Sequence, residues 1–173
     1  MSERAVLTTA MSSMSIAVAK TPYVNIRRAR RDDVETIVTM LADDALGGPR
    51  ERLENPLPAS YFAAFDRVDR DPNLTLVVAE GEGGAVIGCL QLCILPGLSS
   101  QGASRGLIED VRVASHCRSR GIGEQLMQWA VAEARSRGCK LVELLTHHTR
   151  VDAQRFYERL GFAKSHVGMT IRF

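Results

Sequence analysis

The residues best suited to chemistry lie between Val111 and Glu124, where arginines and glycines stand close together. The central stretch reads Arg118-Ser-Arg-Gly-Ile-Gly123, between an apolar run and an amphipathic run. Glycine lets the backbone fold tightly around a ligand, and the first N–H groups of a helix have no acceptor inside that helix. The helix dipole adds about half a positive charge there, and arginines add full charges. The pattern therefore predicts an anion site, and a pyrophosphate would suit it.

Two common phosphate-binding loops do not fit this stretch. No Lys followed by Ser or Thr comes after the glycines, which excludes a P-loop. The three-glycine dinucleotide pattern is absent as well, and no acidic residue ends a following strand where a ribose would be held. A plain strand-to-helix turn with surface arginines remains an alternative on these residues alone.

A second motif lies downstream and reads Ala153-Gln-Arg-Phe-Tyr-Glu-Arg-Leu-Gly-Phe162. With this motif, the chain resembles the GNAT superfamily of N-acetyltransferases. The stretch from Arg118 to Gly123 resembles the family's Arg/Gln-x-x-Gly-x-Gly/Ala signature. The second motif is similar to the family's helix that carries a Phe-Tyr pair and ends at Gly-Phe. Both motifs occur in the family's order, and the resemblance covers residues 23–173.

The resemblance implies acetyl-CoA as the acyl donor, no metal, and direct transfer of the acetyl group to a primary amine. The backbone from Arg118 to Glu124 would hold the pyrophosphate, and main-chain groups of Val111 and Val113 would pair with the pantetheine arm. Many relatives carry Asn where this chain has Arg150, and an arginine there could meet a phosphate or the substrate instead. The donor-binding residues implied are Val111, Arg112, Val113, Arg118, Ser119, Arg120, Gly121, Ile122, Gly123, Glu124, Arg150 and Phe156.

Two proton transfers must accompany such a reaction. A free alkyl ammonium titrates near pH 10, so the attacking amine must lose a proton, and the departing thiolate must gain one. The resemblance makes Tyr157 the acid. Glu109 is the candidate base, acting through a water, because an acidic pair on an apolar strand is either solvated or used. His147 and His148 are rival bases because histidine titrates near neutrality. Each of these residues also has a purely structural alternative. Tyr157 could pack its ring against the sheet, Glu109 could be a solvated carboxylate on an edge strand, and the two histidines could be ordinary loop residues.

Regular elements are predicted around these residues. Alternating or continuous apolar runs predict strands over 23–27, 74–80, 85–95, 107–113, 140–146 and 163–173. Helical spacing predicts helices from Val34 to near Gly47, around 61–68, over 122–137 and over 152–160. The turn at 81–84 predicts a hairpin, and the helix between 107–113 and 140–146 predicts a parallel strand pair. We expect an α/β (α+β) fold with a mixed, mostly antiparallel sheet of six to seven strands and about four helices.

Composition favours one globular domain. The chain has 173 residues, a net charge of +2 and 45% hydrophobic residues, which is ordinary for a soluble protein. The charge balance gives no support for nucleic-acid binding, and no apolar run is long enough to span a membrane. Residues 1–22 lack a signal-peptide pattern and are predicted to be a flexible leader before a single domain over 23–173. Scattered cysteines without zinc-ligand spacing favour a reduced, cytoplasmic protein.

The acceptor is the least legible part of the sequence. The segments 42–69 and 96–102 are the candidates for binding it, and carboxylates in the first could attract a cationic amine or simply be solvated. A small-molecule amine is the leading prediction. A protein N-terminus or lysine comes second, and a non-catalytic acyl-CoA-binding or sensing domain is an alternative of another class. The resemblance also allows a homodimer, through the C-terminal strand or an exposed Trp129.

Overall fold

The computed structural model describes residues 23–173, so the leader predicted for residues 1–22 lies outside the described part. Five strands form one sheet in the order β1-β2-β3-β4-β5. They are β1 (Asn25–Arg28), β2 (Leu74–Glu80), β3 (Val86–Leu95), β4 (Arg105–Val113) and β5 (Leu141–Leu144). The α-helices are α1 (Val34–Ala42), α2 (Ala59–Arg70), the single turn α3 (Ser99–Gly102), α4 (Ile122–Ser136) and α5 (Val151–Arg159). Short 3-10 turns span Arg31–Asp33, Gly48–Arg50, Glu82–Gly84 and Ser115–Cys117.

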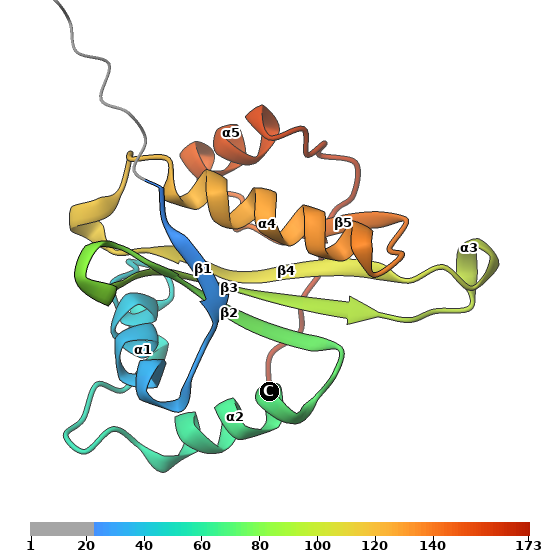
Figure 1. Ribbon diagram of the computed structural model, residues 1–173. Coiled ribbons are helices and arrows are strands. Elements are labelled where there is room, and N and C mark those ends of the chain that lie inside the picture. The colour runs from blue at the N-terminus through green and yellow to red at the C-terminus, as the bar shows by residue number, and fades with distance from the viewer. Residues whose placement is uncertain (1–22) are drawn as a thin grey trace, which may run out of the picture.

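The sheet confirms the predicted strand directions. Neighbouring strands from β1 to β4 are antiparallel. Strands β4 and β5, which precede and follow α4 in the sequence, are parallel neighbours in the sheet. Helices α4 and α5 cover one face of the sheet, and α1 and α2 cover the other (Figure 1). No helix between residues 23 and 173 is long and apolar enough to cross a bilayer.

Each face of the sheet carries its own core. Alternation along β3 sends Leu90 and Leu92 toward the α4 side and Cys89 toward α1. On α4, the stripe of Leu126, Ala130 and Ala134 is fully buried against the first of these faces. The second core continues into the contact between α1 and α2. The two-sided core makes the sheet a rigid platform for the residues at its edge.

A β-bulge interrupts β4 at Asp110, which has a φ of 51°. Between two paired positions β3 advances from Cys89 to Gln91, whereas β4 advances from Glu109 to Arg112, so β4 holds one extra residue. Glu109 and Arg112 therefore lie on the same face, although they are three residues apart. Strict alternation, which would send Glu109 and Asp110 to opposite faces, does not describe this segment.

Strands β4 and β5 separate beyond the bulge. Their pairing runs only from Arg105 opposite Leu141 to Ile108 opposite Leu144. From Glu109 onward, the edge of β4 that faces β5 has no strand partner. The separation that the family resemblance implies is therefore present, and it opens beside the N-terminus of α4.

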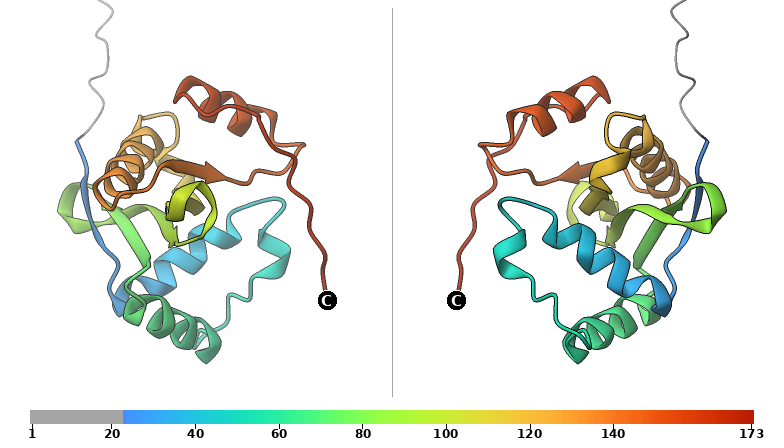
Figure 2. Two further views of the ribbon diagram at one scale, coloured as in Figure 1. Left: turned by 90° about the vertical axis from the view of Figure 1, so that its right-hand side faces the viewer. Right: turned by 90° about the vertical axis from the view of Figure 1, so that its left-hand side faces the viewer.

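The strand predicted over residues 163–173 is wrong, and the sheet has five strands rather than six to seven. The tail has the alternating pattern of a strand, but its apolar side chains are almost fully exposed: Val167 at 90%, Met169 at 92%, Ile171 at 78% and Phe173 at 114%. Such a pattern forms a strand only when a neighbour accepts its hydrogen bonds. The tail instead leaves the sheet edge and runs toward the side of α2 (Figure 2).

Candidate active site

A cavity of about 700 Å³ lies where β4 and β5 separate. The end of β4, the N-terminus of α4, the segment after α1 and the helix α5 all line it. Most of the predicted donor-binding residues do so: Val111, Arg112, Val113, Arg118, Ser119, Gly121, Ile122, Gly123, Glu124, Arg150 and Phe156. Arg120 is exposed and does not reach this wall. Tyr157, the predicted acid, lines the same cavity.

The N-terminus of α4 supplies backbone donors to this cavity. Gly121 is the N-cap residue with a φ of 77°, a left-handed conformation that glycine adopts without strain. No side chain caps this helix. The N–H groups of Ile122, Gly123 and Glu124 therefore have neither an intrahelical acceptor nor a cap. Such a set of donors, with the helix dipole behind it, fits a pyrophosphate.

Two arginine side chains donate hydrogen bonds to the carbonyls of Val111 and Val113, which were predicted to pair with the pantetheine arm. Arg112 donates from Nη1 to the Val111 carbonyl at 2.9 Å, and Arg118 donates from Nε to the Val113 carbonyl at 3.2 Å. Arg118 also donates from Nη2 to the Asp43 carboxylate at 2.9 Å. On the free edge of β4, the carbonyls of Val111 and Val113 thus accept hydrogen bonds from the half-buried Arg112 and the exposed Arg118 rather than from a neighbouring strand.

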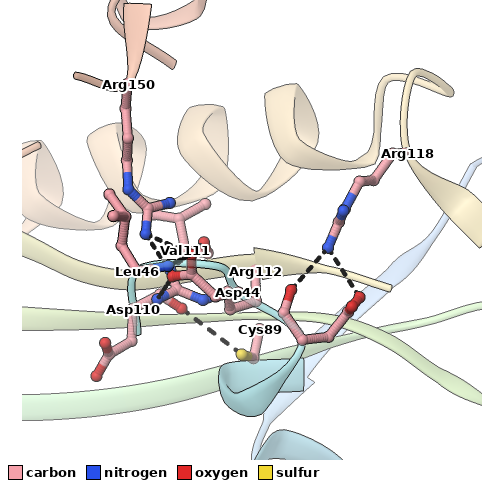
Figure 3. A network of polar contacts seen from close by, with 9 residues as sticks. Asp44, Leu46, Cys89, Asp110, Val111, Arg112, Arg118 and Arg150 are labelled. Atoms are coloured by element: carbon pink, nitrogen blue, oxygen red, sulfur yellow. Dashed lines mark hydrogen bonds and ion pairs between the residues drawn. The ribbon is translucent and has the colours of Figure 1, made fainter. Parts of the chain in front are cut away.

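Asp44 connects both walls of the cavity, and sequence reasoning missed its role. Its carboxylate accepts hydrogen bonds from Arg112 Nη2 at 3.0 Å, from Arg150 Nη2 at 2.6 Å and from the Leu46 N–H at 3.1 Å. Figure 3 shows the carboxylate between the two guanidinium groups. Burial favours a higher pKa for Asp44, but hydrogen bonds from Arg150 and Leu46 and the charge of Arg112 hold the pKa below its usual value. Asp44 is therefore ionised at neutral pH.

One signal in the sequence could have pointed to Asp44. Arg150 replaces an asparagine within a motif, and a charge placed beside a cavity needs a counter-ion. Several carboxylates lie between residues 43 and 54, and the sequence does not say which of them supplies it.

Tyr157 stands between two opposing influences. Burial raises its pKa above the ordinary value, and the nearby charges of Arg112 and Arg150 act in the other direction. Its ring packs against Phe156 at 5.2 Å and Phe162 at 6.2 Å between centroids. The phenol therefore carries its proton at neutral pH, as a general acid must.

The candidate bases lie outside this cavity. Glu109 is exposed, stands opposite Gln91 on β3, and accepts a weak hydrogen bond from Cys93 Sγ at 3.8 Å. His147 and His148 are exposed and stack on one another at 4.3 Å between ring centroids. The structure thus brings Tyr157 and most of the predicted donor-binding residues together, but none of the three candidate bases lines the same cavity.

The uncapped N-terminus of α4, the free edge of β4 and Tyr157 therefore share one cavity. A model of the acetyltransferase (GNAT) family matches residues 37–162. The chain belongs to the GNAT family. Its sheet with helices on both faces is the fold of that family, and the protein is an N-acetyltransferase.

Named relatives of this GNAT protein act on small amines. The aminoalkylphosphonate N-acetyltransferase of Salmonella typhimurium is 31% identical over 152 residues, which cover 86% of this chain and 91% of that protein. The glucosamine 6-phosphate N-acetyltransferase of Trypanosoma brucei brucei is 34% identical over 89 residues, covering 51% of this chain and 58% of that protein. A solved structure from Bacillus halodurans C-125, described as a transcriptional regulator, has a TM-score of 0.84 and 48% identity, and covers 87% of this chain and 100% of its own.

Proposed function

We propose that this GNAT protein transfers the acetyl group of acetyl-CoA to a primary amine of a small molecule. The observation that carries the proposal is the single cavity in which the uncapped N-terminus of α4 and the protonated Tyr157 meet. The first suits a pyrophosphate and the second suits a departing thiolate, and acetyl-CoA contains both.

The residues of the cavity fit this donor. The N–H groups at the start of α4 would bind the pyrophosphate, and Arg118 would add a charge-assisted hydrogen bond after leaving Asp43. The Val113 carbonyl is held by the exposed Arg118 side chain, which can be displaced by an amide group of the pantetheine arm at little cost. The Val111 carbonyl would accept a further hydrogen bond from that arm beside the one from Arg112. Bound acetyl-CoA would supply an activated thioester, and Tyr157 would give its proton to the departing sulfur.

Glu109 is proposed to accept the proton of the amine through water. It lies on the face of the sheet opposite α4, and its exposed carboxylate is accessible to solvent. His147 and His148 are the alternatives, and both sit in the loop after β5.

The acceptor is proposed to be a primary amine that also carries a phosphonate or phosphate group. Both named relatives have acceptors of this kind: an aminoalkylphosphonate and glucosamine 6-phosphate. The charged residues lining the cavity are Asp43, Asp44, Glu124, Arg112, Arg118, Arg150 and Arg159, so cations outnumber anions by one. A protein N-terminus or a lysine stays the alternative acceptor.

Calorimetric titration with acetyl-CoA, followed by a thiol-release assay with chosen amines, tests the proposal. We expect selective binding of acetyl-CoA over NAD and ATP. Aminoethylphosphonate and glucosamine 6-phosphate should then release CoA faster than ethanolamine, which lacks the anionic group. A folded sample that binds no acetyl-CoA would overturn the proposed donor, and equal rates with all three amines would overturn the proposed acceptor class.

We also propose that the protein forms a homodimer through its C-terminal tail. The tail offers four exposed apolar side chains in strand alternation, and β5 is an unpaired edge strand of the kind that accepts an added strand. Trp129 is a poorer candidate than expected, because it is partly buried against the core and not exposed.

A further inference from the structure

The cluster of Asp44, Arg112 and Arg150 joins three distant parts of the chain at the cavity. Asp44 belongs to the segment after α1, Arg112 to β4, and Arg150 to the N-cap of α5. The side chains are 9%, 20% and 32% exposed, respectively. An ion pair with so little solvent around it is not screened as a surface pair is, so the arrangement is a persistent one.

A neighbouring ion pair provides the contrast. Asp43, the adjacent residue, binds Arg118, but these two side chains are 49% and 53% exposed. Exposed pairs contribute little to stability and open readily. Donor binding can therefore release Arg118 from Asp43 and leave the Asp44 cluster in place.

The arginines of the cluster keep unused hydrogen-bond capacity. Asp44 engages only Nη2 of Arg150. Nε of Arg112 is buried and has no partner among the described residues. Asp44 contributes one negative charge and the two arginines contribute two positive charges, so the cluster has a net charge of +1 beside the cavity. Arg112 and Arg150 are also the two charges that act on the phenol of Tyr157.

We propose that Asp44 is a positioning residue for acetyl transfer: by binding Arg112 and Arg150 together, it holds two positive charges beside Tyr157. The inference rests on the proposed function. As the carbon–nitrogen bond forms and the carbon–sulfur bond breaks, the electron pair of the broken bond passes to sulfur. Tyr157 gives its proton to that sulfur and becomes a phenolate, the amine nitrogen loses a proton to solvent, and the phenolate recovers a proton from solvent. The two guanidiniums stabilise the negative charge on sulfur and then on the phenolate, because fixed charges need no rearrangement during the reaction.

Other charged or titratable groups surround Tyr157 and must be separated from this effect. In the cavity they are Asp43, Cys117, Arg118, Glu124 and Arg159. In a second groove, which Tyr157 also lines, they are Arg105, Arg135, Cys139, Lys140, Glu143, Glu158, Lys164 and His166. Asp43 supplies the matched control for Asp44, since it is an adjacent carboxylate that also binds an arginine of the cavity.

The test measures the phenol itself. Tyr157 is replaced by a fluorinated tyrosine, whose phenol ionises nearer neutrality, and its pKa is followed by absorbance in the parent protein and in Asp44→Asn and Asp43→Asn. We expect Asp44→Asn to raise this pKa, because the released arginines move away from the phenol. Asp43→Asn should leave the phenol pKa unchanged. Asp44→Glu keeps a carboxylate that can bind both arginines, so its phenol pKa should lie close to that of the parent protein.

The sign of the shift separates positioning from simple neutralisation. If Asp44 served only as a counter-ion, its removal would leave two unopposed cations in place and the phenol pKa would fall. A fall, or no change, overturns the proposal. In the unmodified enzyme, Asp44→Asn should lower kcat by about 10- to 100-fold with a much smaller change in KM for acetyl-CoA. An unaltered kcat would also contradict it.

Two controls keep this result interpretable. Thermal melting shows whether Asp44→Asn folds, and if it does not, Arg150→Asn removes one arginine and should raise the phenol pKa by itself. Calorimetry with acetyl-CoA tests the proposed function separately. A protein that fails to bind acetyl-CoA but shows the expected phenol shift would retain the link between Asp44 and Tyr157 and lose only its assignment to acetyl transfer.

Discussion

Tyr157 occupies a position where burial and charge oppose each other. Its ring packs against Phe156 and Phe162, and its pKa is raised by burial. A phenol that stays protonated at neutral pH gives a thiolate its proton only when it is well placed, so geometry supplies much of its effect.

Tyr157→Phe should therefore separate chemistry from binding. The phenylalanine keeps the ring packing but removes the proton, so we expect kcat to fall by about 10²- to 10⁴-fold. Acetyl-CoA affinity, measured by calorimetry, should change only slightly because the pyrophosphate cradle is untouched. Equal losses of turnover and affinity would mean that the hydroxyl is needed for structure.

Single residues also mark the limit of what the sequence can tell. Short-range motifs carry Tyr157 and the predicted donor-binding residues, and most of them line one cavity. Asp44 was not predictable, because its partners Arg112 and Arg150 lie 68 and 106 residues away, and local pattern contains no information on such a pairing. Glu109 was chosen because it belongs to an acidic pair on an apolar strand, and the structure places it outside the cavity.

At the scale of elements, the turn before α4 can be tested with a matched pair of glycines. Gly121 and Gly138 both have positive φ, 77° and 79°, at the two ends of the helix. Valine at either position should cost about 1–2 kcal/mol in backbone strain and lower the melting temperature similarly. Only Gly121→Val should lose acetyl-CoA binding in calorimetry, because only Gly121 lines the cavity. Normal acetyl-CoA affinity in Gly121→Val would contradict the proposal that this loop binds the pyrophosphate.

A second element-scale prediction concerns the ion cluster that ties β1 to the start of α1 and to β2. Arg27 bonds Asp33 at 2.7 Å and Glu80 at 2.6 Å. The hydrogen bond from Arg27 and that from the Arg30 N–H outweigh burial and hold the pKa of Asp33 below its usual value. A carboxylate whose pKa is lowered in the folded state stabilises the protein above its unfolded pKa of about 3.9, and this stabilisation is lost as pH falls through the folded value.

Asp33→Asn should accordingly lower the free energy of unfolding at neutral pH by roughly 1–3 kcal/mol. The difference from the parent protein should shrink as the pH falls below about 4, where the unfolded carboxylate becomes protonated, and should vanish below the lowered pKa of the folded state. Urea denaturation across this pH range measures it. A difference that stays constant with pH would show that the charge of Asp33 is not responsible.

The elements before the tail were largely predictable from periodicity, but the bulge in β4 was not. The strand at 74–80 and the parallel pairing across α4 agree with the sequence pattern. The sequence does not predict the bulge, because Asp110 has a positive φ but is not a glycine, the residue that usually indicates this conformation. A tertiary contact accompanies the bulge: the Cys89 thiol donates a weak hydrogen bond to the Asp110 carbonyl at 3.6 Å.

At the scale of the whole molecule, the proposed homodimer through the tail can be tested. If the tail pairs with a second copy, its apolar side chains become buried, and Ile171→Asp should convert a dimer into a monomer by light scattering after gel filtration. Thr170→Asp places the same charge on the other face of the extended tail and should interfere less. A parent protein that is monomeric at every concentration would exclude the homodimer.

The tail also shows why the sequence predicted six to seven strands although the sheet has five. Alternation predicts that a segment is able to pair, but not with which edge or within which molecule. The prediction of a sixth strand used a correct pattern and lacked the partner on which the pattern depends.

The burial of the cysteines gives the protein a built-in reporter. Cys89, Cys93 and Cys117 are buried, and Cys139 alone is partly accessible. The chain has four cysteines, so a maleimide dye should label the native protein once, at Cys139. That residue lines the groove beside residues 163–168 of the tail. The labelling rate should therefore slow with protein concentration if a second copy covers the groove, and it provides a measure of assembly that requires no mutation.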